Sequence, residues 1–449
     1  MNERKQIDAG IFKAYDIRGI YPDELDESVA ERIGRAFVTF LGERRIVVGR
    51  DMRLSSPQLS RHFIEGATSQ GADVVDIGLC STDMIYFASG MLDLPGAMFT
   101  ASHNPKEYNG LKLCRRRAAP ISEDTGIAEI RDLVLAGVFP PAGRRGEVER
   151  RDMLGSYVDH VLGFIDVEAV RPLRVVVDAG NGMAGMLIPA VFERLPARLI
   201  PYCFELDGSF PHHQPSPIEP QNIKLLQDWV LESRADLGMA FDGDADRVFL
   251  VDDKGEPVSA SVTTALVARR ILQTHPGEKV IYNCVNSRIV PETIRQYGGI
   301  PIRERVGHSF IKQTMAETGA IFAGEHSGHY YFRDNFRADS GLIAAMIVLE
   351  TVSLEGKPLS EVVAPFRKYH NSGEINSRVD DVQGKLEQIA AAYPDARVDR
   401  MDGLNVEYDD WWFNVRPSNT EPLLRLNLEA DTLELMRAKT EEVLALIRS

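Results

Sequence analysis

Three stretches of this chain repeat one pattern, in which a strand rich in β-branched residues runs into a turn of Gly, Asn and Asp and then into a helix. The three stretches are 46–51, 175–182 and 280–287. Second strands follow near 71–79, 197–204 and 298–303, and each set closes with a third strand that ends in a polar loop. Strands that alternate with helices predict parallel or mixed sheets, which bind ligands at the carboxyl ends of their strands. We therefore expect three similar α/β domains whose loops face one cleft.

The last part of the chain differs in character. Two predicted strands around 411–415 and 423–428 and a closing helix at 433–447 indicate a smaller α+β unit. A length of 449 residues also exceeds what one hydrophobic core normally serves. The predicted domains are 1–145, 146–251, 252–364 and 365–449.

Composition excludes several classes of protein. The formal net charge of −15 argues against nucleic acid or an anionic membrane as the main partner, so an anionic substrate needs a local cationic pocket. The four cysteines stand far apart without a CxxC pair, which is typical of a reducing compartment. The polar start carries no signal peptide, and no apolar run is long enough to span a bilayer. We expect a soluble cytoplasmic protein, monomeric or weakly homo-oligomeric.

The first polar loop, Thr-Ala-Ser-His-Asn-Pro at 100–105, follows a short apolar strand at 96–99. Asn-Pro at 104–105 and Asn-Gly at 109–110 are turn signals that exclude a helix there. A loop held by a rigid strand is a common place for reactive groups, so we expect the hydroxyl of Ser102 to be exposed on it.

Ser102 has the neighbours that a nucleophile needs. A serine hydroxyl is weakly nucleophilic unless a base or a cation lies beside it, and His103 and Lys112 both lie within loop reach. Tyr15 and Arg18, in a strand-and-turn segment before the first helix, could reach a neighbouring anion. The alternative is an ordinary polar turn whose side chains bond only the backbone.

The second polar loop places three carboxylates at alternate positions, Asp242, Asp244 and Asp246, followed by Arg247. Alternate side chains of an extended segment point the same way, so these carboxylates would repel one another without a cation. Ligands that are all oxygen select a hard ion such as Mg²⁺. A calcium-binding helix-loop-helix is disfavoured because Arg247 occupies the turn position that needs Gly. A solvated acidic turn is a second alternative.

The third polar loop carries Glu325, Ser327 and His329, again at alternate positions. Such a mixture of donors and acceptors suits sugar hydroxyls. His308 follows another predicted strand nearby and, as a single histidine, is equally compatible with a structural role.

The fourth polar loop joins the two strands of the last domain. It carries Arg416, Ser418, Asn419 and Thr420. A guanidinium fork beside two hydroxyls and an amide can hold a phosphate, although an ordinary hairpin loop has a similar composition.

The four loops, in this order and over essentially the whole chain, resemble those of the α-D-phosphohexomutases, and most closely the bacterial phosphomannomutase/phosphoglucomutase group. The resemblance implies three α/β domains with mixed sheets and a smaller C-terminal α+β domain around a central cleft. It implies reversible transfer of phosphate between the 1- and 6-positions of a hexose phosphate, mannose and/or glucose, through a hexose 1,6-bisphosphate that also acts as activator.

The resemblance also assigns residues. Ser102 would be the phosphoserine and would share Mg²⁺ with Asp242, Asp244 and Asp246. The remaining catalytic positions would be Arg18, His103, Lys112 and Arg247, with Lys112 a candidate proton shuttle. The substrate-binding positions would be Tyr15, Arg288, His308, Glu325, Ser327, His329, Arg416, Ser418, Asn419 and Thr420.

The chain departs from some members of this family in two places. Where some members carry a lysine for the substrate phosphate, this chain has Val285 and offers only Arg288 nearby. His326 stands where glucosamine-phosphate mutases usually have Gln, which disfavours an amino-sugar substrate. Three rival functions remain: a phosphoglucosamine mutase, a sugar phosphatase with Asp242 as nucleophile, and a non-catalytic sugar-phosphate binding protein.

Overall fold

The computed structural model describes residues 7–417 and 423–449. The chain forms two compact units. The first, unit 1, consists of Met1–Val258 and Ser327–Ser360, and the second, unit 2, of Ser259–His326 and Glu361–Ser449.

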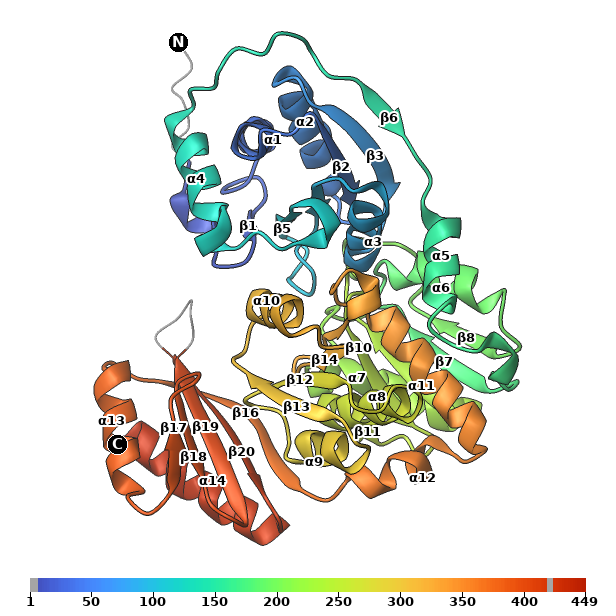
Figure 1. Cartoon of the computed structure of the whole chain (residues 1–449), viewed down its shortest axis with the longest axis vertical. Coiled ribbons are helices and arrows are strands. Elements are labelled where there is room, and N and C mark those ends of the chain that lie inside the picture. Colours follow the sequence, from blue (N-terminus) through green and yellow to red (C-terminus); the bar gives the residue numbers. More distant parts are fainter. Residues whose placement is uncertain (1–6, 418–422) are drawn as a thin grey trace. The chain divides into compact units, whose positions relative to one another are not determined.

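The first sheet of unit 1 has six strands in the order β1-β5-β4-β2-β3-β6 (Figure 1). The strands are β1 (Ile17–Ile20), β2 (Arg45–Arg50), β3 (Asp73–Leu79), β4 (Gly96–Phe99), β5 (Tyr108–Cys114) and β6 (Val148–Arg150). The helices are α1 (Glu27–Leu41), α2 (Ser56–Ser69), α3 (Thr82–Leu92) and α4 (Ile127–Ala136). β2 runs parallel to β3 and β4, whereas β5 is antiparallel to β1 and β4, so the sheet is mixed as predicted.

Local sequence explains the ends of α1. The Asp26 carboxylate accepts a hydrogen bond from the Val29 N–H at 3.0 Å, which satisfies a donor that the first turn leaves open. Gly42 ends the helix with φ of 66°, a conformation that favours glycine. The apolar face of α1 packs with α2 and α4 onto the sheet in one buried cluster.

Asn109 and Gly110 do not form the turn that their sequence predicts. They lie inside β5, where Gly110 pairs with Arg18 of β1. The Asn109 side chain is buried and donates to the hydroxyls of Ser55 and Ser56 at 2.8 and 3.0 Å. These tertiary hydrogen bonds outweigh the local preference of Asn-Gly for a turn.

The second sheet of unit 1 has the order β11-β10-β9-β7-β8 and is also mixed. Its strands are β7 (Arg174–Asp178), β8 (Arg198–Tyr202), β9 (Leu237–Phe241), β10 (Val248–Asp252) and β11 (Pro257–Val258). The helices of this part are α5 (Leu154–Leu162), α6 (Ala184–Phe192) and α7 (Pro220–Ser233). α7 packs its buried side chains against β7, β9 and β10.

The segment 327–360 returns to unit 1 with strand β15 (Tyr330–Phe332) and helix α11 (Gly341–Glu355). Helix α11 is buried over most of its length, and its N-cap is Ser340. Helix α12 (Leu359–Val363) leads on into unit 2. Within the described residues, no helix combines the length and the apolar character that crossing a membrane requires.

Unit 2 contains a parallel arrangement of β13-β12-β14 and a separate five-stranded antiparallel sheet in the order β16-β20-β19-β18-β17 (Figure 1). The first part comprises β12 (Lys279–Asn283), β13 (Ile300–Glu304), β14 (Phe322–Gly324), α8 (Ala260–Thr274), α9 (Ile289–Gln296) and α10 (His308–Thr318). The second comprises β16 (His370–Arg378), β17 (Arg397–Asp399), β18 (Leu404–Glu407), β19 (Trp411–Pro417), β20 (Leu423–Ala430), α13 (Val382–Ala392) and α14 (Leu433–Arg448).

The predicted fold class is confirmed, with three α/β parts that each contain the strand-turn-helix pattern and a C-terminal α+β part. The predicted domain boundaries and the central cleft stay predictions. Ser418, Asn419 and Thr420 lie outside the described residues.

Candidate active site

Ser102 lies three residues after the end of β4, in a turn with an unusual backbone. Its φ is 50°, a left-handed conformation that costs energy for a residue with a side chain, and its N–H donates to the Thr100 hydroxyl at 2.9 Å. The side chain is buried, so the prediction of an exposed hydroxyl is wrong. The loop after β9 covers it, and a side chain at Gly243 would place Cβ 2.5 Å from the Ser102 carbonyl oxygen. Glycine is therefore needed there for the two loops to approach.

Arg53 holds the Ser102 loop and was not predicted from the sequence. Its buried guanidinium donates to four carbonyl oxygens at 2.7 to 3.0 Å, those of Ser102, Asn104, Pro105 and Tyr108. The carboxylate of Asp51 lies 3.3 Å away and supplies the counter-charge. Buried charges need such pairing and hydrogen bonding, so this arrangement fixes the turn that carries Ser102.

The hydroxyl of Ser102 contacts three ionisable groups. It donates to Oδ2 of Asp242 at 2.8 Å, and it lies 3.2 Å from both Nδ1 of His103 and Nη2 of Arg247. Nε of Arg247 donates to the same Asp242 oxygen at 2.8 Å. Burial and the nearby Arg247 and Arg18 lower the pKa of His103 well below its ordinary value, so its imidazole is neutral. The serine therefore bonds ionisable side chains, and the alternative of a turn that bonds only backbone is wrong.

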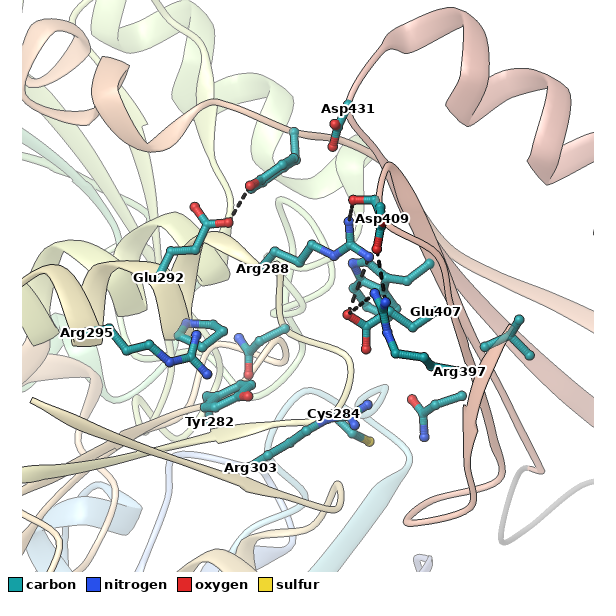
Figure 2. Close-up of a pocket in the computed structure, with 16 residues that line it drawn as sticks. Tyr282, Cys284, Arg288, Glu292, Arg295, Arg303, Arg397, Glu407, Asp409 and Asp431 are labelled. Atoms are coloured by element: carbon teal, nitrogen blue, oxygen red, sulfur yellow. Dashed lines mark hydrogen bonds and ion pairs between the residues drawn. The ribbon is translucent and has the colours of Figure 1, made fainter. Parts of the chain in front are cut away.

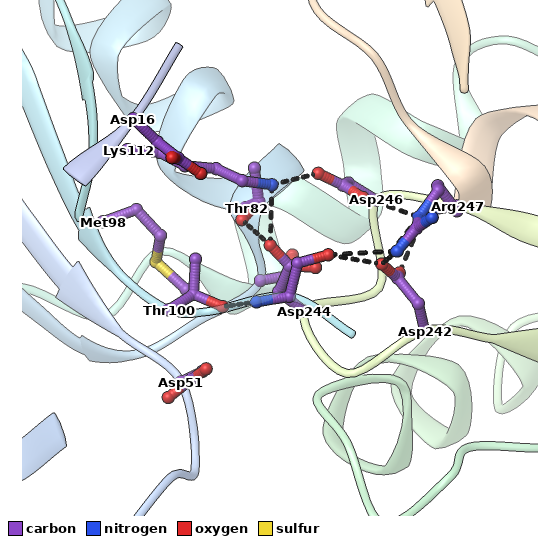
Figure 3. A network of polar contacts seen from close by, with 12 residues as sticks. Asp16, Asp51, Thr82, Met98, Thr100, Lys112, Asp242, Asp244, Asp246 and Arg247 are labelled. Atoms are coloured by element: carbon purple, nitrogen blue, oxygen red, sulfur yellow. Dashed lines mark hydrogen bonds and ion pairs between the residues drawn. The ribbon is translucent and has the colours of Figure 1, made fainter. Parts of the chain in front are cut away.

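The three predicted carboxylates gather in one buried cluster between β9 and β10 (Figure 3). One oxygen from each of Asp242, Asp244 and Asp246 lies within 4.8 Å of the other two. Oδ1 of Asp244 and Oδ1 of Asp246 are buried without a hydrogen-bond partner among the described residues. Buried acceptors without donors, all of them oxygen, fit a hard metal ion. The burial contradicts a solvated acidic turn, and the flanking strands contradict a helix-loop-helix site.

Lys112 lies inside this cluster, with Nζ 2.8 Å from Oδ2 of Asp244 and 2.6 Å from Oδ2 of Asp246. Burial alone would lower the pKa of Lys112, but the two carboxylates outweigh it and raise the pKa well above its ordinary value. Burial also raises the pKa of Asp242 to about 8, against the opposing charge of Arg247. Burial acts in the same direction on Asp244, where Lys112 outweighs it and lowers the pKa. A lysine thus supplies part of the positive charge that the carboxylates need.

Arg18 of β1 approaches the site, and Tyr15 lies in the segment just before that strand. Nη1 of Arg18 donates to the Asn104 side chain at 2.5 Å, and Nη2 pairs with Asp16. Arg18 thus contacts the Ser102 loop, as predicted for a neighbour of the serine. Tyr15 is half-buried in the bend that precedes β1.

Ser327 and His329 also belong to unit 1 and lie beside the carboxylate cluster. The Ser327 hydroxyl is 2.9 Å from Nδ1 of His329, and Nε2 of His329 is 3.7 Å from Oδ1 of Asp246. A backbone bridge pairs His329 with Arg247. The structure therefore brings the third loop's serine and histidine to the metal loop.

The other predicted sugar and phosphate contacts lie in unit 2. Oε1 of Glu325 is 3.4 Å from both the Asn283 side-chain nitrogen and the Gly307 N–H, next to His308 at the start of α10. Nη2 of Arg416 donates to Glu374 at 2.6 Å.

Arg288 lines a separate cavity of unit 2 (Figure 2). The cavity has a volume of about 460 Å³ and lies among α9, β12, β13 and the strands of the last sheet. The Arg288 guanidinium donates to the carbonyl oxygens of Asp409 at 2.7 Å and Trp411 at 3.3 Å, and also to that of Tyr408. These three bonds engage part of the guanidinium that would have to replace the lysine that some family members carry at the position of Val285.

A second mixed group of ionisable residues, Asp178, Cys203 and His213, lies at the ends of β7 and β8. Nε2 of His213 is 2.9 Å from Oδ2 of Asp178. Burial would lower the pKa of His213, but the hydrogen bonds that its imidazole makes with Asp178 and Cys203 outweigh burial and raise the pKa to about 10. The four cysteines of the chain are free.

Comparison with known proteins gives one family over the chain. Four models of the phosphoglucomutase/phosphomannomutase family match successive segments of this chain. They are alpha/beta/alpha domain I at 9–139, domain II at 155–255, domain III at 260–369 and the C-terminal domain at 374–446. A phosphomannomutase of Escherichia coli is 43% identical over 451 residues, covering 97% of this chain and 99% of the relative. Phosphohexose mutases of Xanthomonas campestris pv. campestris are 40% identical over 442 residues, covering 97% and 99%.

Solved structures agree with the sequence relatives. The crystal structure of a phosphoglucomutase/phosphomannomutase family protein from Burkholderia thailandensis matches with a TM-score of 0.90 and 34% identity, covering 98% of this chain and 97% of that one. A putative phosphomannomutase from Thermus thermophilus shares the fold, with a TM-score of 0.84 at 23% identity over 99% and 100% of the two chains. The chain belongs to the phosphoglucomutase/phosphomannomutase family of hexose-phosphate mutases.

Proposed function

We propose that this protein moves a phosphoryl group reversibly between the 1- and 6-positions of a hexose phosphate, mannose and/or glucose, with Ser102 as the covalent carrier. The observation that carries the proposal is the buried Ser102 hydroxyl, 2.8 Å from Asp242 in a cluster of three carboxylates. We further propose domains at 1–145, 146–251, 252–364 and 365–449, in line with the family matches.

In the proposed reaction, phosphoserine 102 gives its phosphoryl group to the free hydroxyl of the bound hexose phosphate. The Ser102 Oγ–phosphorus bond breaks and a bond from the sugar oxygen to phosphorus forms, which produces a hexose 1,6-bisphosphate. The proton of the sugar hydroxyl passes to the leaving Ser102 Oγ through the proposed shuttle Lys112. After the bisphosphate turns round, Ser102 takes the other phosphoryl group back. Free bisphosphate serves as activator because it can phosphorylate an empty Ser102.

The chain's own residues supply the electrostatics of this transfer. Arg247 contacts both the Ser102 hydroxyl and Asp242, so it can stabilise charge on the transferring group. Asp242, Asp244, Asp246 and the Ser102 oxygen would hold Mg²⁺, which when bound neutralises phosphate charge and stabilises the leaving serine oxygen. Lys112 bonds Asp244 of the metal loop, and Arg18 bonds Asn104 of the Ser102 loop. Lys112 is the proposed proton shuttle.

Recognition of the sugar and of the remote phosphate is proposed for the remaining positions. Glu325, Ser327, His308 and His329 offer acceptors and imidazoles for sugar hydroxyls, and Tyr15 offers a phenol. Arg416, with Ser418, Asn419 and Thr420, is proposed to hold the phosphate that does not react. Arg288 is proposed as a further substrate-binding residue, although three hydrogen bonds to backbone carbonyls already engage part of its guanidinium.

A product analysis separates this proposal from its rivals. Purified protein is incubated with mannose 1-phosphate, glucose 1-phosphate and glucosamine 1-phosphate, and both the 6-phosphate and free phosphate are measured. We expect the 6-phosphates of mannose and/or glucose, no free phosphate, and a phosphorylated Ser102 peptide by mass spectrometry. Free phosphate with an unmodified Ser102 would support the phosphatase with Asp242 as nucleophile. Binding without turnover would support a sugar-phosphate binding protein, and turnover of the amino sugar alone a phosphoglucosamine mutase.

A further inference from the structure

Thr82, the first residue of α3, holds one of the three carboxylates from behind. Its hydroxyl donates to Oδ2 of Asp244, and its backbone N–H donates to the Asp244 carbonyl oxygen at 3.1 Å (Figure 3). Lys112 donates to the same Oδ2 at 2.8 Å. With both donors on Oδ2, the other oxygen of Asp244 is left buried without a hydrogen-bond partner among the described residues. The contacts of Thr82 therefore help to decide which oxygen of Asp244 is left without a hydrogen-bond donor and can bind a cation.

Asp83, the next residue, fixes the start of α3 to two distant segments. It is fully buried, and its carboxylate accepts hydrogen bonds from Ser81 and from Tyr157 of α5, and from Ser340 at 2.8 Å. Ser340 is in turn the N-cap of α11. Burial raises the pKa of Asp83 to about 7, which shows how strongly this carboxyl is removed from water.

A fully buried carboxyl group is costly unless its oxygens are satisfied, and hydrophobic packing would hold a helix more simply. Three hydroxyl donors from three segments fix both oxygens of Asp83, and with them the direction in which α3 begins. Thr82 is adjacent in sequence. Any change in the direction in which α3 begins therefore also moves the Thr82 hydroxyl that bonds Asp244.

We infer that Thr82 and Asp83 are positioning residues for the metal loop: Asp83 fixes the start of α3, and Thr82 then holds Oδ2 of Asp244, which would leave Oδ1 to bind a cation. This inference rests on the proposed metal-dependent function. Groups that hold a metal ligand from behind typically change metal affinity or activity by 10- to 100-fold. Neither residue touches the reacting atoms, so neither is a catalytic residue.

The test measures Mn²⁺ binding to the full chain by electron paramagnetic resonance, independently of turnover. Thr82→Val removes the hydroxyl and keeps the shape of the side chain, and we expect Mn²⁺ affinity to fall by about 10- to 100-fold. Thr82→Ser keeps the hydroxyl and is expected to restore most of that affinity. Asp83→Asn is expected to weaken binding by about 10-fold, because its amide meets hydroxyls that all donate. Ser89→Ala is the matched control, since Ser89 is a buried residue of α3 whose hydroxyl donates to the carbonyl oxygens of Leu94 and Arg115.

Activity assays on the same variants separate positioning from general damage. For Thr82→Val we expect kcat to fall and the Mn²⁺ concentration for half-maximal rate to rise, while KM for the hexose phosphate stays the same. Wild-type Mn²⁺ affinity in Thr82→Val, with Ser89→Ala also normal, would overturn the inference and leave the proposed function standing. Failure of the wild-type protein itself to bind Mn²⁺ would overturn the proposed metal site and the inference together. If Asp83→Asn fails to fold, the pair of Thr82 variants decides alone.

Discussion

Two neighbouring strands of one sheet in unit 1 end in aspartates with opposite surroundings. β7 and β9 run parallel, and the first ends at Asp178 while the second leads directly into Asp242. Both oxygens of Asp178 have partners, one in the Gly180 N–H at 2.9 Å and the other in His213 at 2.9 Å. In the loop after β9, two buried carboxylate oxygens have no hydrogen-bond partner among the described residues.

The two strand ends differ in whether positively charged side chains fully balance the carboxylates. His213 gives Asp178 its own proton-bearing partner, and the Nδ1 of that imidazole is 2.8 Å from the Gln214 carbonyl oxygen, so the ring is held at both nitrogens. The β9 loop carries three carboxylates against Lys112 and Arg247. An acidic group that completes its pairing within the protein stabilises the fold, whereas one that leaves oxygens open can bind a cation.

The largest expected effect comes from removal of the Ser102 hydroxyl, which bonds Asp242 in the loop after β9. Ser102→Ala deletes the covalent route, so we expect kcat/KM to fall by at least about 1000-fold. The thermal midpoint should change little, because the loop is held through backbone carbonyls by Arg53. The measurement is a coupled assay at saturating metal, with Ser69→Ala on α2 as control. A variant that still isomerises at close to the wild-type rate would remove Ser102 from the mechanism.

The β7 side is tested by the pH dependence of stability. The folded pKa of His213 is about 10 against an ordinary value of 6.5, so its contribution is complete below pH 6.5 and is lost as the pH rises through 10. At 1.36 kcal/mol per unit, the shift of the His213 pKa corresponds to a contribution of about 5 kcal/mol. In urea unfolding experiments across this pH range, the free energy of unfolding of the wild type should fall as the pH rises. The free energy of unfolding of His213→Gln should not show this fall.

The control for this experiment is His62→Gln, since His62 is half-buried on α2 and its Nδ1 lies 2.9 Å from the Gln58 carbonyl oxygen of the same helix. Its unfolding curves should keep the pH dependence of the wild type. Parallel curves for the wild type and His213→Gln would mean that Asp178 is not paired with a charged histidine, and the contrast between the two strand ends would fail.

Metal affinity distinguishes the two strand ends directly. Asp244→Asn removes a charged oxygen from the cluster, and we expect Mn²⁺ affinity to fall by about 100-fold without unfolding. His213→Gln should leave the affinity unchanged. The measurement is titration of metal into chelated protein, with activity followed in parallel. Full activity after chelation, or an equal loss of affinity in both variants, would contradict a cation site confined to the β9 loop.

Much of the site was predictable because its residue types lie close together in the sequence. The Ser102 loop and the alternating aspartates each occupy one short segment, and strand ends bring such segments to one edge of a sheet. Arg53 and Thr82 could not be predicted in this way. Their hydrogen bonds to Ser102 and Asp244 span 49 and 162 residues, and their local sequence is that of an ordinary loop and helix start.

The errors have the same physical origin. Local preference predicts a turn at Asn109 and an exposed Ser102, but the structure buries both residues against segments that are remote in sequence. Arg288 stays a predicted phosphate ligand, and the structure adds that part of its guanidinium bonds the carbonyls of another hairpin. Residue type indicates what a group can bind, and only tertiary contacts decide which partner it has.

The smallest expected effect concerns a third carboxylate, Glu374 of unit 2, which has two arginine partners. Its two oxygens accept from Arg416 at 2.6 Å and from Arg425 at 3.0 Å, and these charges outweigh burial and lower the pKa of Glu374. Nε of Arg416 is buried without a hydrogen-bond partner among the described residues. Arg416 is thus held in place by Glu374, which suits its proposed role of holding a phosphate in two orientations. We expect Arg416→Ala to lower kcat/KM by about 10- to 150-fold, the scale of a charged hydrogen bond, equally for the 1-phosphate and the 6-phosphate.

Arg425→Ala serves as the matched control, because it removes the other partner of Glu374. Rates in both directions and the bisphosphate released per turnover are measured together, and more bisphosphate should escape from Arg416→Ala. A loss confined to one substrate would require separate phosphate sites, and one shared cradle would have to be abandoned.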